Sequence, residues 1–120
     1  MLYFNNVILQ GRLVADPELM RTKAGDSVCN IFVASQRKYS KTEESKVDII
    51  KCEAWGGTAE YIARNMEKGA MVNIQGGIRC RKWQDENNKT RVDQFVHIDV
   101  IDFSPTNNSR RNKTENNTTE

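Results

Sequence analysis

The chain has 120 residues, of which 38% are hydrophobic, and this is enough for one modest core in a single domain. Its formal net charge of +2 at pH 7 does not by itself indicate a polyanionic partner, because such a partner is indicated by clustered charge rather than by the sum. The N-terminus lacks a basic region followed by an apolar run, and no stretch approaches membrane-spanning length, so we expect a cytoplasmic protein with no membrane partner.

The cysteines and the histidine give no metal-binding spacing. Cys29, Cys52 and Cys80 form no Cys-x-x-Cys pair, and the only histidine, His97, has no cysteine or second histidine beside it. We therefore expect the cysteines to be small buried residues in a reducing compartment, and we expect no metal ion or cofactor.

The first strand is predicted over residues 5–15, where Val7, Leu9 and Leu13 point inward. Gly11 in its middle predicts a bend or a close approach of another backbone. The chain then turns through residues 16–26, a segment with Pro17 and Gly25 that we expect to contain no strand.

Two further strands are predicted over residues 27–36 and 47–55. In the first of them Cys29, Ile31 and Val33 fill the core, which leaves Phe32 on the outer face. The charged loop of residues 37–46 lies between the two strands. In the second, alternation places Ile50, Cys52 and Ala54 on the core face, and Ile49, Lys51, Glu53 and Trp55 on the outer face.

A short helix is predicted after Gly56-Gly57, with Thr58 as its cap and a stop at Gly69. Ala59, Ile62, Ala63 and Met66 recur at helical spacing, so the helix should close one end of the core. The last strand is predicted over residues 92–103, and its inward residues are Val96, Ile98 and Val100.

The most informative stretch is the strand predicted over residues 71–84. Alternation gives it a core face of Val72, Ile74, Ile78 and Cys80, and an outer face of Asn73, Gln75, Arg79, Arg81 and Trp83. Cations beside a flat ring are what single-stranded nucleic acid requires, because phosphates need charge and unpaired bases need stacking partners. The alternative is a solvated strand edge whose charges prevent aggregation, with Trp83 packed under a loop.

Five strands with one helix between strands three and four predict an all-β protein, a five-stranded Greek-key barrel of the OB-fold type. The pattern alone leaves a sandwich or an SH3-like barrel open. We expect residues 1–104 to form this domain and residues 105–120, which are polar and charged, to be a disordered tail.

Several motifs together resemble the single-stranded DNA-binding protein (SSB) family of bacteria and their phages, over residue 6 to about residue 103. They are Asn6-Val7-Ile8-Leu9-Gln10-Gly11-Arg12-Leu13, Asp16-Pro17-Glu18-Leu19, Cys52-Glu53-Ala54-Trp55-Gly56, Ala59-Glu60-Tyr61-Ile62, Lys68-Gly69 and Arg79-Cys80-Arg81-Lys82-Trp83. The resemblance implies an OB fold, a homotetramer built as a dimer of dimers, sequence-tolerant binding of single-stranded DNA, and roles in replication, recombination and repair.

The resemblance also implies a set of binding residues. The stacking aromatics of the family match Tyr39, Trp55 and Trp83, while Ile49 stands where the family usually has Trp or Phe, and we hypothesise that Phe32 compensates. Along the DNA backbone we place the cations Arg12, Arg21, Arg37, Lys38, Lys51, Arg79, Arg81 and Lys82.

The end of the chain departs from the family pattern. Many members carry a long linker that ends in an acidic, phenylalanine-tipped peptide for docking onto replication enzymes, whereas here a polar segment runs to Glu120 without an apolar tip. Recruitment of replication proteins by that route is therefore doubtful, and we expect a phage- or prophage-type member that mainly coats DNA, in the bacterial or host cytoplasm.

Two other functions are alternatives to the binding of single-stranded DNA. A nuclease needs clustered carboxylates for metal ions, and Asp48, Glu53, Asp93 and Asp99 are scattered, so we expect no enzyme. An RNA-binding or protein-bridging OB module stays open, because contacts to a 2′-hydroxyl are not visible in a sequence.

Overall fold

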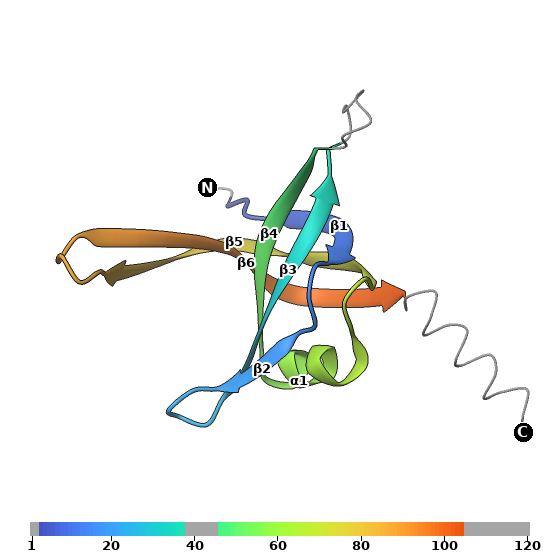
Figure 1. Cartoon of the computed structure of the whole chain (residues 1–120), viewed down its shortest axis with the longest axis horizontal. Helices are drawn as coiled ribbons and strands as arrows, with labels where there is room; N and C mark the ends of the chain where they lie inside the picture. The colour runs from blue at the N-terminus through green and yellow to red at the C-terminus, as the bar shows by residue number, and fades with distance from the viewer. Residues whose placement is uncertain (1–2, 38–45, 105–120) are drawn as a thin grey trace, which may run out of the picture.

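Six strands and one helix make up the computed structural model, which describes residues 3–37 and 46–104 (Figure 1). In chain order they are β1 (Val7–Leu13), β2 (Glu18–Arg21), β3 (Ser27–Gln36), β4 (Val47–Trp55), α1 (Gly56–Asn65), β5 (Met71–Gln84) and β6 (Thr90–Ser104). Lys38, Tyr39 and the tail of residues 105–120 lie outside the described residues.

The strands form one sheet in the order β1-β5-β6-β4-β3-β2, and an additional pairing of β1 with β3 closes it into a barrel. All pairings are antiparallel except that between β4 and β6, which is parallel. The predicted all-β OB-fold barrel, with one short helix after its third long strand, is therefore confirmed. The unpredicted strand is β2, which pairs with the start of β3 at one edge of the sheet.

The barrel core contains the inward residues of β1, β3, β4, β5 and β6. Cys29, Val33, Cys52 and Val72 are completely buried. The helix α1 covers one end of the core with Ala59 and Ile62, as its apolar spacing predicts. Among the described residues, no helix has both the length and the apolar character that crossing a bilayer requires.

The predicted core face of β5 and β6 is wrong at three positions. Ile78 and Val100 are 50% and 61% exposed, and Cys80 is also exposed. Beyond Gly77 the hairpin of β5 and β6 leaves the barrel as a long arm, residues 78–95, so the inward side of β5 has no core to enter there (Figure 1). Val100 changes face because a β-bulge shifts the register between Gln75 and Gly76.

The start of α1 also differs from the prediction. The helix begins at Gly56 directly after β4, and its N-cap is Trp55, which makes no side-chain capping bond. Thr58 therefore lies inside the first turn rather than before it. Gly56 has a φ of 62°, a left-handed conformation that glycine adopts without the steric cost of a Cβ atom.

Two glycines allow strands to approach closely. A Cβ atom on Gly11 would collide with the carbonyl oxygen of Ala34, which confirms the predicted close approach at this position. A Cβ atom on Gly76, at the bulge, would collide with the carbonyl oxygen of His97 and lie 3.3 Å from the Cα of Ile98.

We predict that Gly76→Ala lowers the free energy of unfolding by about 2–3 kcal/mol, because the methyl group can be accommodated only by moving backbone. Gly57→Ala is the matched control: its Cβ would meet nothing within 4 Å, and alanine in a helix leaves stability unchanged or raises it by up to about 1 kcal/mol. Urea denaturation followed by circular dichroism measures both. Equal stability of the two variants would contradict the packing at Gly76.

Candidate nucleic-acid interface

The outer face of β3 and β4 continues onto the inner half of the arm. Register pairs Phe32 with Lys51, and Val28 with Trp55, across β3 and β4. The Arg81 guanidinium on β5 reaches the Glu53 carboxylate on β4, so the side of β5 that carries Arg81 joins the outer face of β4. We call this surface the stacking face; it comprises Phe32, Lys51, Glu53, Trp55, Arg79, Arg81, Trp83 and Phe95.

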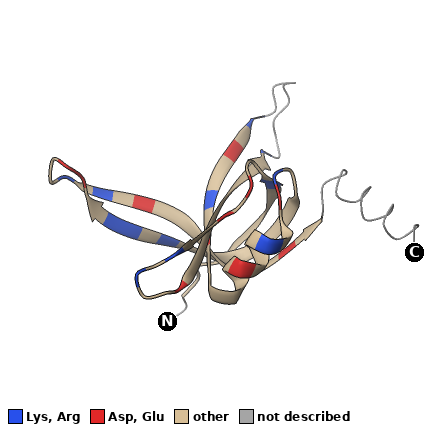
Figure 2. Cartoon of the chain, turned by 60° about the horizontal axis from the view of Figure 1, so that its bottom comes forward, with Lys and Arg blue, Asp and Glu red and all other residues tan. Residues whose placement is uncertain are grey.

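Three aromatic rings on the stacking face are partly open to solvent. Phe32 is 43% exposed, Trp55 39% and Trp83 46%. Trp83 follows Arg81 by two residues in β5, so alternation puts both side chains on the same side of the strand. Lys and Arg residues, blue in the ribbon of Figure 2, recur along the arm that carries Trp83.

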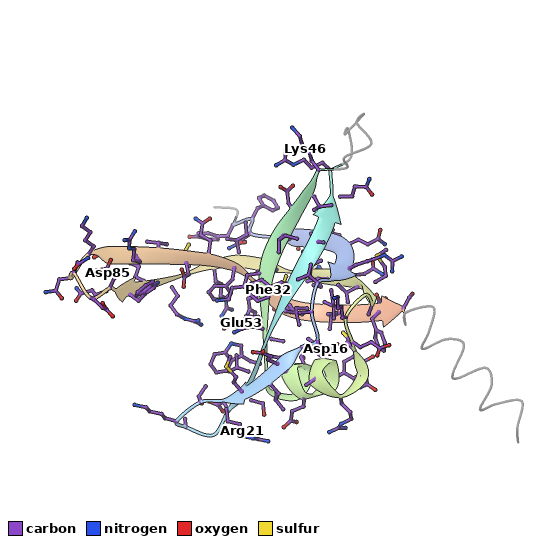
Figure 3. The ribbon with its side chains drawn as sticks, viewed as in Figure 1. Asp16, Arg21, Phe32, Lys46, Glu53 and Asp85 are labelled. Atoms are coloured by element: carbon purple, nitrogen blue, oxygen red, sulfur yellow. The ribbon has the colours of Figure 1, made fainter. Side chains whose placement is uncertain are left out.

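A buried carboxylate lies at the centre of the stacking face. Glu53 is only 2% exposed, and its position between β3 and the root of the arm is labelled in Figure 3. The Trp55 Nε1–H donates to Glu53 Oε1 at 2.7 Å. Arg81 donates to both carboxylate oxygens, from Nη2 to Oε1 at 3.0 Å and from Nη1 to Oε2 at 3.2 Å. One carboxylate therefore orients a stacking ring and a guanidinium at once.

The protonation of Glu53 follows from these contacts. Burial raises the pKa of the Glu53 carboxyl, but the hydrogen bonds from Arg81 and Trp55, with the charges of Arg81 and Lys51, outweigh it and hold the pKa below its ordinary value. Hydrogen bonding to the same carboxylate raises the pKa of Arg81. The pair is charged on both sides at neutral pH.

Phe95 on β6 is a member of the stacking face that sequence reasoning missed. Its ring is 6% exposed because two cations cover it, with the Arg81 Cζ at 4.9 Å and the Lys51 Nζ at 5.9 Å from the ring centroid. The sequence could have identified Phe95 as an outer-face residue, because alternation in β6 puts it on the side opposite the inward residue Val96. These contacts hold Lys51 and Arg81 against the sheet by cation–π attraction.

A cavity of about 390 Å³ opens beside Trp55, between β2 and β4. Met20 and Arg21, which sequence reasoning placed in a loop, line it from β2. Arg21 also lies 3.7 Å from the Glu60 carboxylate on α1. The predicted cation Arg21 and the predicted ring Trp55 thus line the same cavity.

Other predicted cations lie away from the stacking face or already form a hydrogen bond or an ion pair within the protein. Arg12 lines a separate cavity of about 330 Å³ and donates to the carbonyl oxygen of Gly69 at 2.9 Å. Arg37 forms a two-pronged ion pair with Asp48, whose closest contact is 2.9 Å. Lys82 lies on the side of the arm opposite Trp83 by alternation.

Ile49 and the loop residues complete the predicted set. Ile49 is 54% exposed and pairs with Ala34 at the far end of β4 from Trp55, on the same side of the strand as Lys51. The predicted contacts of Lys38 and Tyr39 fall outside the described residues.

The chemistry of the stacking face is that of binding. Within residues 3–37 and 46–104, no group of three or more His, Cys, Asp or Glu side chains is arranged to hold a metal ion. Partly exposed rings beside fixed cations provide stacking surfaces for unpaired bases and positive charge for the phosphates between them.

We predict that Glu53→Gln lowers the free energy of unfolding at pH 7 by about 1–2 kcal/mol, since hydrogen bonds to a charged partner are lost and the half-exposed Arg81 is partly rehydrated. The stability that Glu53 provides is complete above its ordinary pKa of 4.5 and is lost as the pH falls through the lower pKa of the folded state. The difference between the two proteins should therefore shrink at low pH.

Urea denaturation at a series of pH values measures this difference. Glu86→Gln, at the exposed tip of the arm, is the control and should match the unchanged protein throughout. A Glu53→Gln protein as stable as the unchanged one at pH 7 would show that the carboxylate network contributes nothing.

Comparison with known proteins places this geometry in a family. Residues 4–104 match the model of the single-strand binding protein family. Relatives include a single-stranded DNA-binding protein of Oceanobacillus iheyensis, 36% identical over 107 residues that cover 88% of this chain, and single-stranded DNA-binding protein B of Bacillus subtilis, 37% identical over 101 residues that cover 83%.

The matched segment spans different fractions of the relatives' own lengths. The matched segment spans 89% of the Bacillus subtilis protein but 66%, just under two thirds, of the Oceanobacillus iheyensis protein. Single-stranded DNA-binding protein 1 of Synechocystis sp. is 32% identical over 114 residues, which cover 94% of this chain and 93% of that protein. With its barrel and its row of exposed rings, the chain belongs to the single-strand binding protein family.

Proposed function

We propose that the protein binds single-stranded DNA along the stacking face, without strong sequence preference, and acts by binding rather than by catalysis. The observation that carries this proposal is the row of partly exposed rings Phe32, Trp55 and Trp83 on one face, with Lys51, Arg79 and Arg81 between them. The names of the relatives, which are single-stranded DNA-binding proteins, support it.

Base stacking and phosphate contacts provide affinity without sequence specificity. Every base has a π-face, so stacking on Trp55 and Trp83 tolerates any sequence, whereas the cations act on phosphates that are the same in every nucleotide. The proposed contact set also includes Arg12, Arg21, Arg37, Lys82 and Ile49, together with Lys38 and Tyr39, which lie outside the described residues.

The biological setting that we propose is the one that membership of the family implies. A protein that coats unpaired strands protects them from cleavage and from re-pairing while DNA is replicated, recombined or repaired. We place this role in the cytoplasm of a bacterium, or of the host if the protein is encoded by a phage.

We predict that Trp55→Ala and Trp83→Ala each weaken binding of oligo-dT by about 5- to 150-fold, the loss of one stacked base. Because stacking releases no counterions, the dependence of affinity on salt should keep its slope. Tryptophan fluorescence titration at several salt concentrations measures both quantities, and each variant keeps one tryptophan as the reporter.

Tyr61→Ala is the control for this experiment, because Tyr61 is 44% exposed on α1 and packs against Phe103 away from the stacking face. It should bind oligo-dT normally. Absence of any binding by the unchanged protein at low salt would refute the proposal. Tighter binding of a matched RNA oligomer would favour an RNA-binding module, and metal-dependent loss of the oligomer would favour a nuclease.

We further propose that four copies assemble as a dimer of dimers. Support comes from the outer side of β1, β5 and β6, where Ile8 is 82% exposed and Val100 61% exposed on either side of Gln75. Beside them, hydrogen bonds join Gln10 to Asn73 and Asn73 to Asp102 in an ordered row. An exposed patch that combines apolar side chains with hydrogen-bonded polar ones suits contact with a second copy.

We predict that Ile8→Asp lowers the mass measured by light scattering from that of a tetramer to that of a smaller species, because the carboxylate would be buried against a second copy. Val92→Asp, at a 51% exposed position on the arm, is the control and should leave the mass unchanged. A tetramer that tolerates Ile8→Asp would exclude this surface as an interface.

A further inference from the structure

The cavity beside Trp55 has an apolar wall and a polar wall. Its apolar wall is a row across three strands, since Met20 pairs with Val28 and Val28 pairs with Trp55. Its polar wall is the neighbouring pair of Asn30 on β3 and Glu53 on β4. The volume of about 390 Å³ lies within the range of about 300–1,000 Å³ that small-molecule sites occupy.

Cations lie at the rim of the cavity. Arg21 and Arg81 both line it, from β2 and β5 respectively, and their side chains are 62% and 50% exposed. Figure 3 labels Arg21 at the end of β2. Each guanidinium is ion-paired, Arg21 with Glu60 and Arg81 with Glu53, so the rim combines basic with acidic groups.

The side chain of Asn30 is incompletely bonded. Its Oδ1 is buried and has no hydrogen-bond partner within the part of the chain that the structure describes. A buried acceptor without a partner costs about 1–3 kcal/mol, so a ligand that offers an N–H recovers free energy here. The terminal torsion of asparagine is soft, and a small rotation suffices to present the amide to the cavity.

Glu53 cannot serve the ligand in the same way. Both of its oxygens already accept hydrogen bonds, from Trp55 and from Arg81. The indole N–H of Trp55 is likewise engaged. A ligand in the cavity therefore meets Trp55 as an apolar ring and the Asn30 Oδ1 as an acceptor that has no partner among the described residues.

We propose that this cavity is a nucleobase subsite, in which one base of the bound strand packs on Trp55 and Met20 while the Asn30 amide hydrogen-bonds to the edge of that base. This inference rests on the proposed function and adds a contact to the base edge. Cytosine and adenine present an amino group, whereas thymine and guanine present a ring N–H, so each base has a donor for Oδ1. The contact is thus compatible with sequence-tolerant binding.

The test compares a base with an analogue that has the same shape but no hydrogen-bonding edge. A short oligo-dT and the same oligomer built from 2,4-difluorotoluene deoxynucleosides are titrated against the unchanged protein and against Asn30→Leu. The ratio of the two affinities should fall about 3- to 10-fold in Asn30→Leu, which corresponds to one lost hydrogen bond. Binding of the analogue itself should change little.

Two controls separate this contact from a structural role. Since Oδ1 has no partner, Asn30→Leu should not lower the melting temperature, and Asn30→Ala provides the same comparison if leucine does not fit. Asn65→Ala, on α1, should leave the affinity ratio unchanged.

The outcomes are distinct. An unchanged ratio in Asn30→Leu and Asn30→Ala, with normal binding of oligo-dT by the starting protein, would overturn the subsite and leave the proposed function intact. Failure of the starting protein to bind either oligomer would overturn the proposed function itself.

Discussion

The ordered arrangement of the stacking face depends on one buried carboxylate. Glu53 carries its charge into the sheet because Arg81 and Trp55 satisfy both of its oxygens, and in return it fixes their orientation. Arg81 then covers the ring of Phe95, which Lys51 approaches as well. Rings and cations are therefore set in place before any ligand arrives, and less conformational entropy is lost when a flexible strand binds.

Alternation of apolar and polar residues predicted much of the barrel. The bounds expected for β3 and β4 agree with those observed, because both strands run through the core and their central inward positions are apolar. The strand β2 was missed because its four residues are all exposed and have no buried side. The faces of Ile78 and Val100 depend on where the barrel ends and on a bulge, and neither is encoded in local alternation.

The sequence predicted which site residues lie together when they belong to the same strand. It did not predict contacts between site residues on different strands. Trp55 and Lys51 belong to the same side of β4 by spacing alone. The contact of Glu53 with Arg81 joins residues 28 positions apart, and the cover over Phe95 requires three strands at once. The roles of all these residues in DNA binding stay predictions until they are measured.

The junction at Trp55 constrains how the chain can vary in length. This residue ends β4, occupies the N-cap position of α1 and carries a partly exposed ring, and no loop separates the two elements. An inserted or deleted residue on either side would rotate the ring away from Glu53 or pull the helix off the core. Insertions can be absorbed at the turn of the arm, whereas the spacing from Glu53 through Trp55 to Ile62 must stay constant in any descendant that keeps this site.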